Sequence, residues 1–181
     1  GIKVSLWDRD SEHINNLSRD RENKRYQAGH PFPESITVTG DLFQAIDGAT
    51  CVVMVVPSHG YREVYRQLFP MLAENTLIVS AVKGIEIESG LTMTGVMRQE
   101  ATTCKPLPLG VLSGPSFAAE VAERQPTAVT VAFEELPAAQ AVQQLFSTEY
   151  FRVYSSNDVI GLEISGAMKN VIAIAAGICD G

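Results

Sequence analysis

A lysine and an asparagine interrupt an otherwise apolar segment near the end of the chain, residues 166–177. The apolar residues of this segment recur at three- and four-residue steps, which predicts a helix. Lys169 must therefore either extend its ammonium group to water or line a polar cavity. Burial disfavours the charged form and lowers the pKa of a lysine, and such a lysine is suited to proton transfer near neutral pH. The segment alone leaves both alternatives open.

Two further candidate sites follow apolar segments that are typical of buried strands. Lys83 comes directly after residues 76–82, and the loop 113–117 follows another such segment. In parallel sheets, ligands bind beyond the carboxyl ends of the strands. Lys83 can clamp an anion or polarise a carbonyl, and Gly114 and Ser116 offer backbone N–H groups and a hydroxyl to an anion. The alternatives are a solvated strand end for Lys83 and an ordinary helix cap at Ser116.

Charged residues of opposite sign end the first predicted strand. In dinucleotide-binding folds, an acidic residue at the end of the second strand holds the ribose diol of NAD, whereas an arginine there receives the 2′-phosphate of NADP. Asp8 and Arg9 are both present, so the sequence does not choose between the two cofactors. Ordinary solvation of a strand end is the alternative for both residues.

The elements that must position these residues alternate regularly between strand and helix. Hydrophobic patterns predict strands at 2–7, 36–39, 51–56, 76–82, 109–112, 127–132 and 151–154. They predict helices at 11–20, 41–48, 61–72, 91–101, 117–123 and 137–147. This order predicts an α/β fold with a mostly parallel sheet. His59 falls between a strand and a helix, and we expect it to be a loop residue near a ligand.

The composition indicates a globular protein. The chain has 181 residues, of which 45% are hydrophobic and 19% charged, so it can form a core. Its length fits one domain, or one domain with part of another. The formal net charge is -7, and the basic residues at 19–25 are interleaved with Asp20 and Glu22. These charges argue against nucleic acid as a partner.

The cysteines and the apolar segments lead to expectations about the cellular location of the protein. Cys51, Cys104 and Cys179 show no metal-ligand spacing, so we expect no metal site and a reducing, cytoplasmic location. Cys51 and Cys179 lie in apolar runs and are expected in the core. No signal peptide is recognised, and no apolar run approaches the ~20 residues that span a bilayer. We therefore expect no insertion into a membrane.

Two sequence blocks carry a family resemblance. They are Ser-Gly-Pro-Ser-Phe-Ala at 113–118 and Gly-Ala-x-Lys-Asn-Val at 166–171. Shorter blocks occur in matching order at 6–10, 21–26, 56–58, 83–86, 126–128, 151–154 and 158–161. With these blocks the chain resembles bacterial-type NAD(P)-dependent glycerol-3-phosphate dehydrogenase over nearly its whole length. The family interconverts dihydroxyacetone phosphate and sn-glycerol 3-phosphate with NAD or NADP and feeds glycerophospholipid synthesis.

The resemblance implies an arrangement of domains. Residues 1–157 would form an NAD(P)-binding Rossmann-like domain, and residues 158–181 would begin an all-helical substrate-binding domain. The first strand and the Gly-rich loop of the family would precede Gly1, and the rest of the helical domain would follow Gly181. We expect this segment alone to be inactive, and to be poorly stable or to associate, because loss of a central strand exposes the edges of its neighbours.

The resemblance also implies roles for individual residues. Lys169 would be the general acid/base for the substrate carbonyl, and Lys83 a second catalytic residue that contacts both cofactor and substrate. The implied substrate-binding residues are Lys83, Gly114, Ser116, Lys169 and Asn170. The implied cofactor-binding residues are Arg9, Tyr26, Lys83 and Ala118. We also expect a homodimer.

The sequence differs from the family's usual pattern at two places, and two other functions are compatible with it. Asp8 stands where the family usually has glycine, and Gln27-Ala28 where it often has Leu-Pro. Another two-domain dehydrogenase, of the 3-hydroxyacid or 6-phosphogluconate type, would share the architecture but lacks this pairing of blocks. A non-catalytic remnant that binds a nucleotide is the alternative outside enzymes.

Overall fold

The computed structural model describes residues 2–101 and 107–181, so Cys104 lies outside the described residues. The strands are β1 (Val4–Trp7), β2 (Ile36–Thr39), β3 (Cys51–Met54), β4 (Leu77–Ser80), β5 (Leu109–Ser113), β6 (Thr127–Phe133) and β7 (Phe151–Ser156). The helices are α1 (Ser11–Asp20), α2 (Leu42–Ile46), α3 (Ser58–Leu68), the 3-10 turn η1 (Phe69–Met71), α4 (Met93–Glu100), α5 (Ala118–Ala122), α6 (Leu136–Phe146) and α7 (Val159–Asp180).

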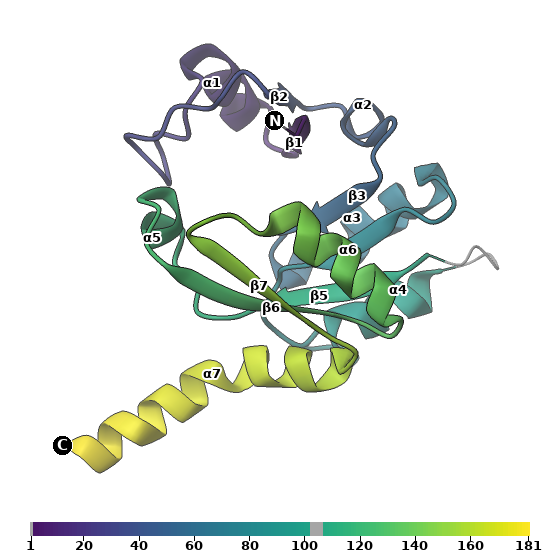
Figure 1. Ribbon diagram of the computed structural model, residues 1–181. Coiled ribbons are helices and arrows are strands. Elements are labelled where there is room, and N and C mark those ends of the chain that lie inside the picture. The colour runs from purple at the N-terminus through teal and green to yellow at the C-terminus, as the bar shows by residue number, and fades with distance from the viewer. Residues whose placement is uncertain (1, 102–106) are drawn as a thin grey trace.

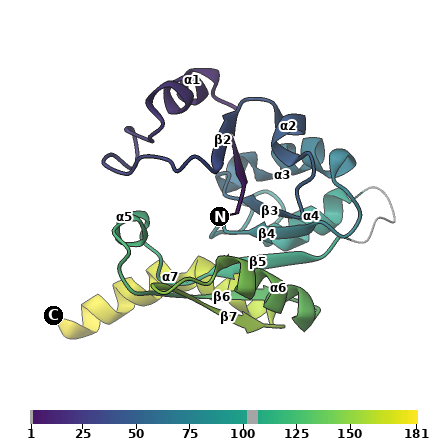
Figure 2. The ribbon, with the colours of Figure 1, turned by 45° about the horizontal axis from the view of Figure 1, so that its top comes forward.

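The strands form two sheets with mostly parallel pairing. β1 pairs with β2, and a second sheet has the order β3-β4-β5-β6-β7. Every pair is parallel except β5 with β6, which is antiparallel. The predicted α/β class with a mostly parallel sheet is therefore confirmed, and Figure 2 shows how the strands of the larger sheet lie in sequence order.

The larger sheet buries both of its faces, as its β-branched composition predicts. Ile78 points to a core formed with α3 and α4, whereas the next residue, Val79, points to a core formed with α6. On β5 and β6, Val111 and Ala132 pack against Val159 at the start of α7. Successive strand residues face opposite sides, so one sheet supports α3, α4 and α7 on one face and α6 on the other.

Each sheet has two outer edges, and those of β1 and β3 have no strand partner among residues 2–101 and 107–181, since β1 pairs only with β2 and β3 only with β4. Apolar side chains near these edges are open to solvent: Val4 on β1 is 45% exposed, and Val53 on β3 is 41% exposed. The strands β1 and β3 thus expose apolar side chains, as expected for strands beside a missing neighbour.

Helix α3 begins earlier than the sequence predicts. The sequence pattern predicts that this helix begins near residue 61, whereas α3 begins at Ser58. Pro57 is the residue before the helix, and the segment 55–57 is all that separates β3 from α3. His59 is therefore a first-turn helical residue, and its expected place in a loop is wrong.

Helix α7 is the last element and extends past the sheet (Figures 1 and 2). Its first turns pack on β5 and β6, while its later apolar residues are exposed, Ile174 by 65% and Ile178 by 76%. By length and composition alone, α7 could cross a membrane, although a soluble core helix passes the same test. The expectation that no apolar segment approaches the length of a membrane span is therefore wrong.

The two described cysteines differ in burial. Cys179 is exposed and Cys51 is partly buried, so the expected core position is wrong for Cys179.

Candidate active site

Lys83 joins the loops that follow two neighbouring strands. It lies just beyond the carboxyl end of β4, and its Nζ donates a hydrogen bond of 2.9 Å to the carbonyl oxygen of Gly114, just beyond β5. Because β4 and β5 are parallel, their carboxyl ends meet at one edge of the sheet. The structure thus brings together Lys83 and Gly114, as the sequence predicts. Partial burial, and secondarily the charge of Lys169, lower the pKa of Lys83 below its ordinary value.

Gly114 is required by the path of its loop. Its φ is +155°, and a Cβ at this position would stand 2.8 Å from the Cα of Val129 on β6. Any side chain would therefore push the loop away from β6, and with it the carbonyl group that Lys83 binds. Ser116, two residues on, is partly buried, and Ala118 is exposed at the first position of α5.

Gly166 seats helix α7 against this sheet edge. A Cβ at Gly166 would lie 2.7 Å from the Oγ of Ser113, the last residue of β5, and 3.8 Å from the Cγ of Lys83. Ser113 is itself buried. A glycine at this position lets the helix backbone approach Ser113 and Lys83 closely.

Lys169 and Asn170 follow Gly166 by about one turn of α7. Both side chains are exposed, so Lys169 holds its ammonium group in water and the lining of a closed cavity does not describe it. Gly166, three residues before Lys169, brings α7 close to the Lys83 side chain, and the charge of Lys169 contributes to the lowered pKa of Lys83. The lysine whose pKa is lowered by partial burial is thus Lys83, the candidate that follows strand β4.

Glu163 on α7 and Thr94 on α4 bind each other close to Gly166, and neither is among the candidate residues that the sequence predicts. Glu163 lies one turn before Gly166, is 6% exposed, and accepts hydrogen bonds from the backbone N–H and the hydroxyl of Thr94 on α4. One sequence signal was available: Glu163 is an acid within the apolar stripe that includes Val159 and Gly166.

The candidate cofactor residues are spread over several elements. Arg9 follows β1, and its Nη1 lies 3.5 Å from the position that a Cβ at Gly60 on α3 would take. Tyr26 is 67% exposed, and its ring has an edge contact with His13 and a cation–π contact with Arg25. The structure thus brings Arg9 to the start of α3, while Tyr26 lies beside α1.

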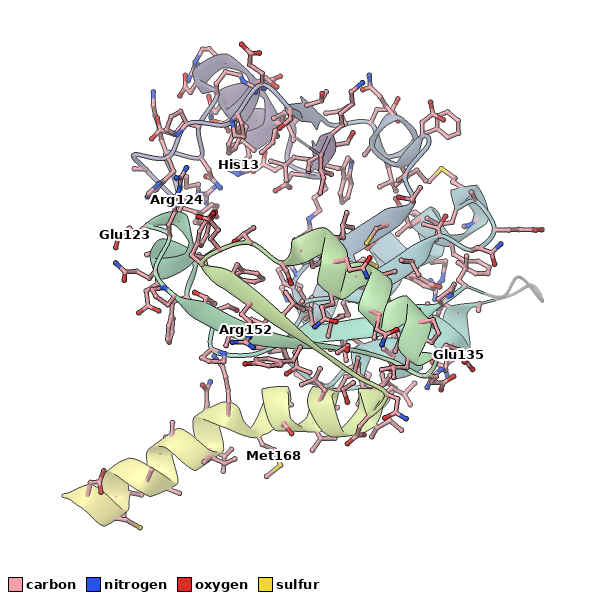
Figure 3. All side chains as sticks on the ribbon, in the orientation of Figure 1. His13, Glu123, Arg124, Glu135, Arg152 and Met168 are labelled. Atoms are coloured by element: carbon pink, nitrogen blue, oxygen red, sulfur yellow. The ribbon has the colours of Figure 1, made fainter. Side chains whose placement is uncertain are left out.

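Helix α1 lies above α5 in Figure 3, which labels His13 on α1 and, below it, Glu123 and Arg124 in the segment that follows α5. A cavity of about 360 Å³ lies along α1, and its lining includes His13 and none of the candidate residues of the site. Its walls mix carboxylates with basic groups, so it offers no single charge to a ligand.

The residues present fit a dinucleotide at the sheet edge. Cationic Arg9 and Lys83 follow β1 and β4, and the first turn of α3, where Gly60 lies beside Arg9, has no side-chain cap. Cations and a helix start that lacks a side-chain cap complement the phosphates of such a cofactor. The chemistry of these donor groups is consistent with NAD or NADP.

Comparison with known proteins places the chain in a family. Residues 1–139 match the family described as NAD-dependent glycerol-3-phosphate dehydrogenase N-terminus, and residues 158–181 match its C-terminus. A glycerol-3-phosphate dehydrogenase (NAD(P)+) of Desulfotalea psychrophila is 55% identical over 184 residues, which cover 100% of this chain and 54% of the relative. The counterpart from Syntrophobacter fumaroxidans is 44% identical over 100% of this chain and 53% of its own length.

A solved structure gives the same result. The crystal structure of glycerol-3-phosphate dehydrogenase from Coxiella burnetii superposes with a TM-score of 0.88 at 35% identity, over 98% of this chain and 54% of that one. The chain spans about half the length of the curated relatives it matches. Since the matched N-terminal region alone covers most of its residues, the chain belongs to the NAD-dependent glycerol-3-phosphate dehydrogenase family.

Proposed function

We propose that the protein containing this chain interconverts dihydroxyacetone phosphate and sn-glycerol 3-phosphate with NADH or NADPH, and so supplies glycerophospholipid synthesis. The observation that carries the proposal is the bond between Lys83 and Gly114 at the carboxyl ends of β4 and β5, beside which α7 is seated by Gly166, three residues before Lys169. The family membership and the names of the relatives support the same reaction.

Lys169 is proposed as the general acid/base. Reduction of the substrate ketone places negative charge on its oxygen, and an ammonium group can stabilise that charge and donate the proton. The exposed side chain of Lys169 leaves α7 about one turn after the close contact at Gly166, and it is free to reach a substrate at the sheet edge. In the reverse direction, the neutral amine would accept the proton from the alcohol.

Lys83 and the loop after β5 are proposed to hold the substrate. Lys83 is fixed by its bond to Gly114 and presents a positive charge to a phosphate or to the developing oxyanion. Backbone N–H groups near Gly114 and the hydroxyl of Ser116 can complete an anion site, and Asn170 can donate from α7. The lowered pKa of Lys83 also makes it a second proton-transfer candidate.

Arg9, Tyr26, Lys83 and Ala118 are proposed to contact the cofactor. When bound, NADH or NADPH supplies the hydride. Arg9 can bind a phosphate, and the exposed ring of Tyr26 offers a surface for stacking. Ala118 leaves room beside the backbone of α5, and Lys83 reaches both ligands.

Residues 1–157 are proposed as the cofactor-binding domain, and residues 158–181 as the start of the substrate-binding domain. In a protein of the relatives' length, further helices would cover the exposed apolar side chains of α7, so protein rather than lipid would surround them. A cytoplasmic homodimer is part of this proposal. Light scattering of the complete protein would measure the assembly.

The test is Lys169→Ala in the complete enzyme, assayed with dihydroxyacetone phosphate and either reduced cofactor. Loss of a general acid should lower kcat by about 10²–10⁴-fold. Met168→Ala is the matched control, because Met168 is the preceding residue and projects away from the sheet (Figure 3). An unchanged kcat in Lys169→Ala would remove Lys169 from its role. A wild-type enzyme without activity would overturn the function and favour a non-catalytic nucleotide-binding protein.

A further inference from the structure

Glu163 is a buried acid whose two oxygens both bind one residue of another helix. Its Oε1 accepts from the backbone N–H of Thr94 at 2.8 Å, and its Oε2 accepts from the Thr94 hydroxyl at 2.6 Å. The two residues are 69 positions apart in the chain. None of the ion pairs among residues 2–101 and 107–181 includes Glu163, so no basic side chain within that part of the chain balances its charge.

The position of Thr94 explains how this acid is accommodated. Thr94 is the second residue of α4, which begins at Met93 after the cap Thr92. The first N–H groups of a helix have no partner within the helix, and the start of a helix carries partial positive charge. Glu163 therefore acts as an added cap for α4, supplied by α7. Its buried neighbour Tyr61 has a raised pKa, caused by burial and then by the Glu163 charge, and so remains a neutral phenol.

The bond to Thr94 and the contact at Gly166 lie on one face of α7. Glu163 and Gly166 are three residues apart and lie on the buried face of the helix. Lys169 follows after three more residues; it is turned by about 120° around the axis from Glu163 and is exposed beside that face. At 1.5 Å per residue, Lys169 lies about 9 Å along the axis from Glu163. Apolar packing alone lets a helix slide or turn on a sheet, whereas two directional hydrogen bonds and one close contact set its position.

We propose that Glu163 is a positioning residue, which binds the start of α4 and thereby holds α7 so that Lys169 stands beside Lys83. The inference rests on the proposed role of Lys169 at the substrate carbonyl. Without the Thr94 bonds, α7 keeps its apolar contacts but loses its fixed register, and Lys169 moves relative to the substrate. A purely structural role for Glu163 would instead lower stability and leave the rate of the folded enzyme unchanged.

The experiment compares Glu163→Ala with Glu163→Gln in the complete enzyme. Misplacement of a catalytic group by about 1 Å can cost about 10²-fold in rate, so kcat of the folded Ala variant should fall by about that factor while KM for the cofactor stays unchanged. The Gln variant should recover most of the rate, because its amide can accept from the Thr94 N–H and bond to the hydroxyl.

Asp158→Ala is the matched control. Asp158 caps the start of α7 by accepting from Gly161 N at 2.8 Å, so its loss weakens the same helix without removing the tie to α4. Its kcat should stay near the wild-type value. If the Ala variant of Glu163 does not fold, Thr94→Val removes only the hydroxyl bond and should show a smaller fall in kcat of the same kind. An unchanged kcat in the folded variants, or an equal fall in Asp158→Ala, would overturn the proposal.

A second readout does not depend on activity. A short amine-to-amine cross-linker should join Lys83 to Lys169 in the wild type and in Glu163→Gln, with a several-fold lower yield in Glu163→Ala, measured by peptide mass spectrometry. If the wild-type enzyme fails to reduce dihydroxyacetone phosphate, the proposed function fails and the cross-link yield still decides the placement of Lys169. An equal yield in all variants would refute the positioning role.

Discussion

Gly166 on α7 lies directly against Ser113 at the end of β5, so closely that a Cβ on Gly166 would stand 2.7 Å from the Ser113 Oγ. Real Cβ atoms essentially never approach another heavy atom so closely. The contact sets the distance between α7 and the edge of the sheet that carries Lys83. It also makes the position of α7 sensitive to a single methyl group.

Replacement of Gly166 by alanine should destabilise the chain. Helix propensity alone would favour alanine by about 1 kcal/mol, but overpacking typically costs about 1–3 kcal/mol. We expect a net loss of stability of about 1 kcal/mol, measured by chemical denaturation. Ser113→Ala in the same chain should restore stability, because it removes the Oγ and leaves the Ser113 Cβ at 3.7 Å.

Gly177 provides the control for this prediction. It lies on the same helix, and a Cβ there would meet nothing within 4 Å. Gly177→Ala should therefore stabilise the chain by about 0.5–1 kcal/mol through helix propensity. Equal effects of the two glycine substitutions would show that Ser113 moves aside without cost.

The pKa of Lys83 should depend on the charge at position 169. Burial is the larger cause of its lowered pKa, and the charge of Lys169 is the smaller one. Lys169→Gln should therefore raise the pKa of Lys83 part of the way toward its ordinary value of 10.5, whereas Lys169→Arg should not. Nuclear magnetic resonance of the lysine side chains as a function of pH would measure it. The same pKa in both variants would show that the two amines do not interact.

The lowered pKa also gives the sign of the effect of Lys83 on stability. The unfolded chain binds the Lys83 proton more readily than the folded chain, so burial of the charged amine opposes folding below the folded-state pKa. This unfavourable contribution should decrease as the pH rises from the folded-state pKa toward 10.5. Lys83→Met should flatten the stability profile over that range, relative to the wild type.

Glu100 should make the protein sensitive to acid. Hydrogen bonds from Arg66 and then from Arg62 lower the pKa of Glu100 to about 2, from an ordinary value of 4.5. The stabilisation is fully present above 4.5 and is lost as the pH falls toward 2. Melting temperatures measured between these pH values should fall less steeply in Glu100→Gln than in the wild type.

Glu134 is the control for that experiment. It pairs with Arg98 at the surface, where its side chain is 72% exposed. Exposed pairs contribute little to stability, so Glu134→Gln should keep the wild-type dependence on pH. An identical acid profile for Glu100→Gln and the wild type would exclude the Arg62–Glu100–Arg66 cluster as the source of acid sensitivity.

Arg9 should favour NADPH over NADH. The carboxylate of Asp8 accepts from the backbone N–H of Asp10 at 3.0 Å, whereas the guanidinium of Arg9 extends toward the start of α3. A charge-assisted hydrogen bond contributes about 1.5–3 kcal/mol, so Arg9→Gln should raise KM for NADPH by about tenfold or more. KM for NADH should change little. Steady-state kinetics of the complete enzyme with both cofactors would measure this, and equal changes would exclude binding of the 2′-phosphate by Arg9.

The sequence by itself determined the alternation of strands and helices and the meeting of Lys83 with Gly114. Helix α1 occupies the predicted residues because its signals are local: Asp10 caps it by accepting from the N–H groups of Glu12 and His13. Strand β2 also has the predicted bounds. Lys83 and Gly114 could be expected to meet, since the carboxyl ends of neighbouring parallel strands lie at one edge of a sheet.

Only the tertiary structure decided how α7 lies on that sheet. The reversed direction of β6, the helical position of His59 and the solvation of Lys169 depend on which elements pack together, and the residue pattern carries no such information. The bonds between Glu163 and Thr94 join residues 69 positions apart. Local periodicity identifies which face of a helix is buried, but the partner that a polar group meets on that face depends on the packing of distant segments.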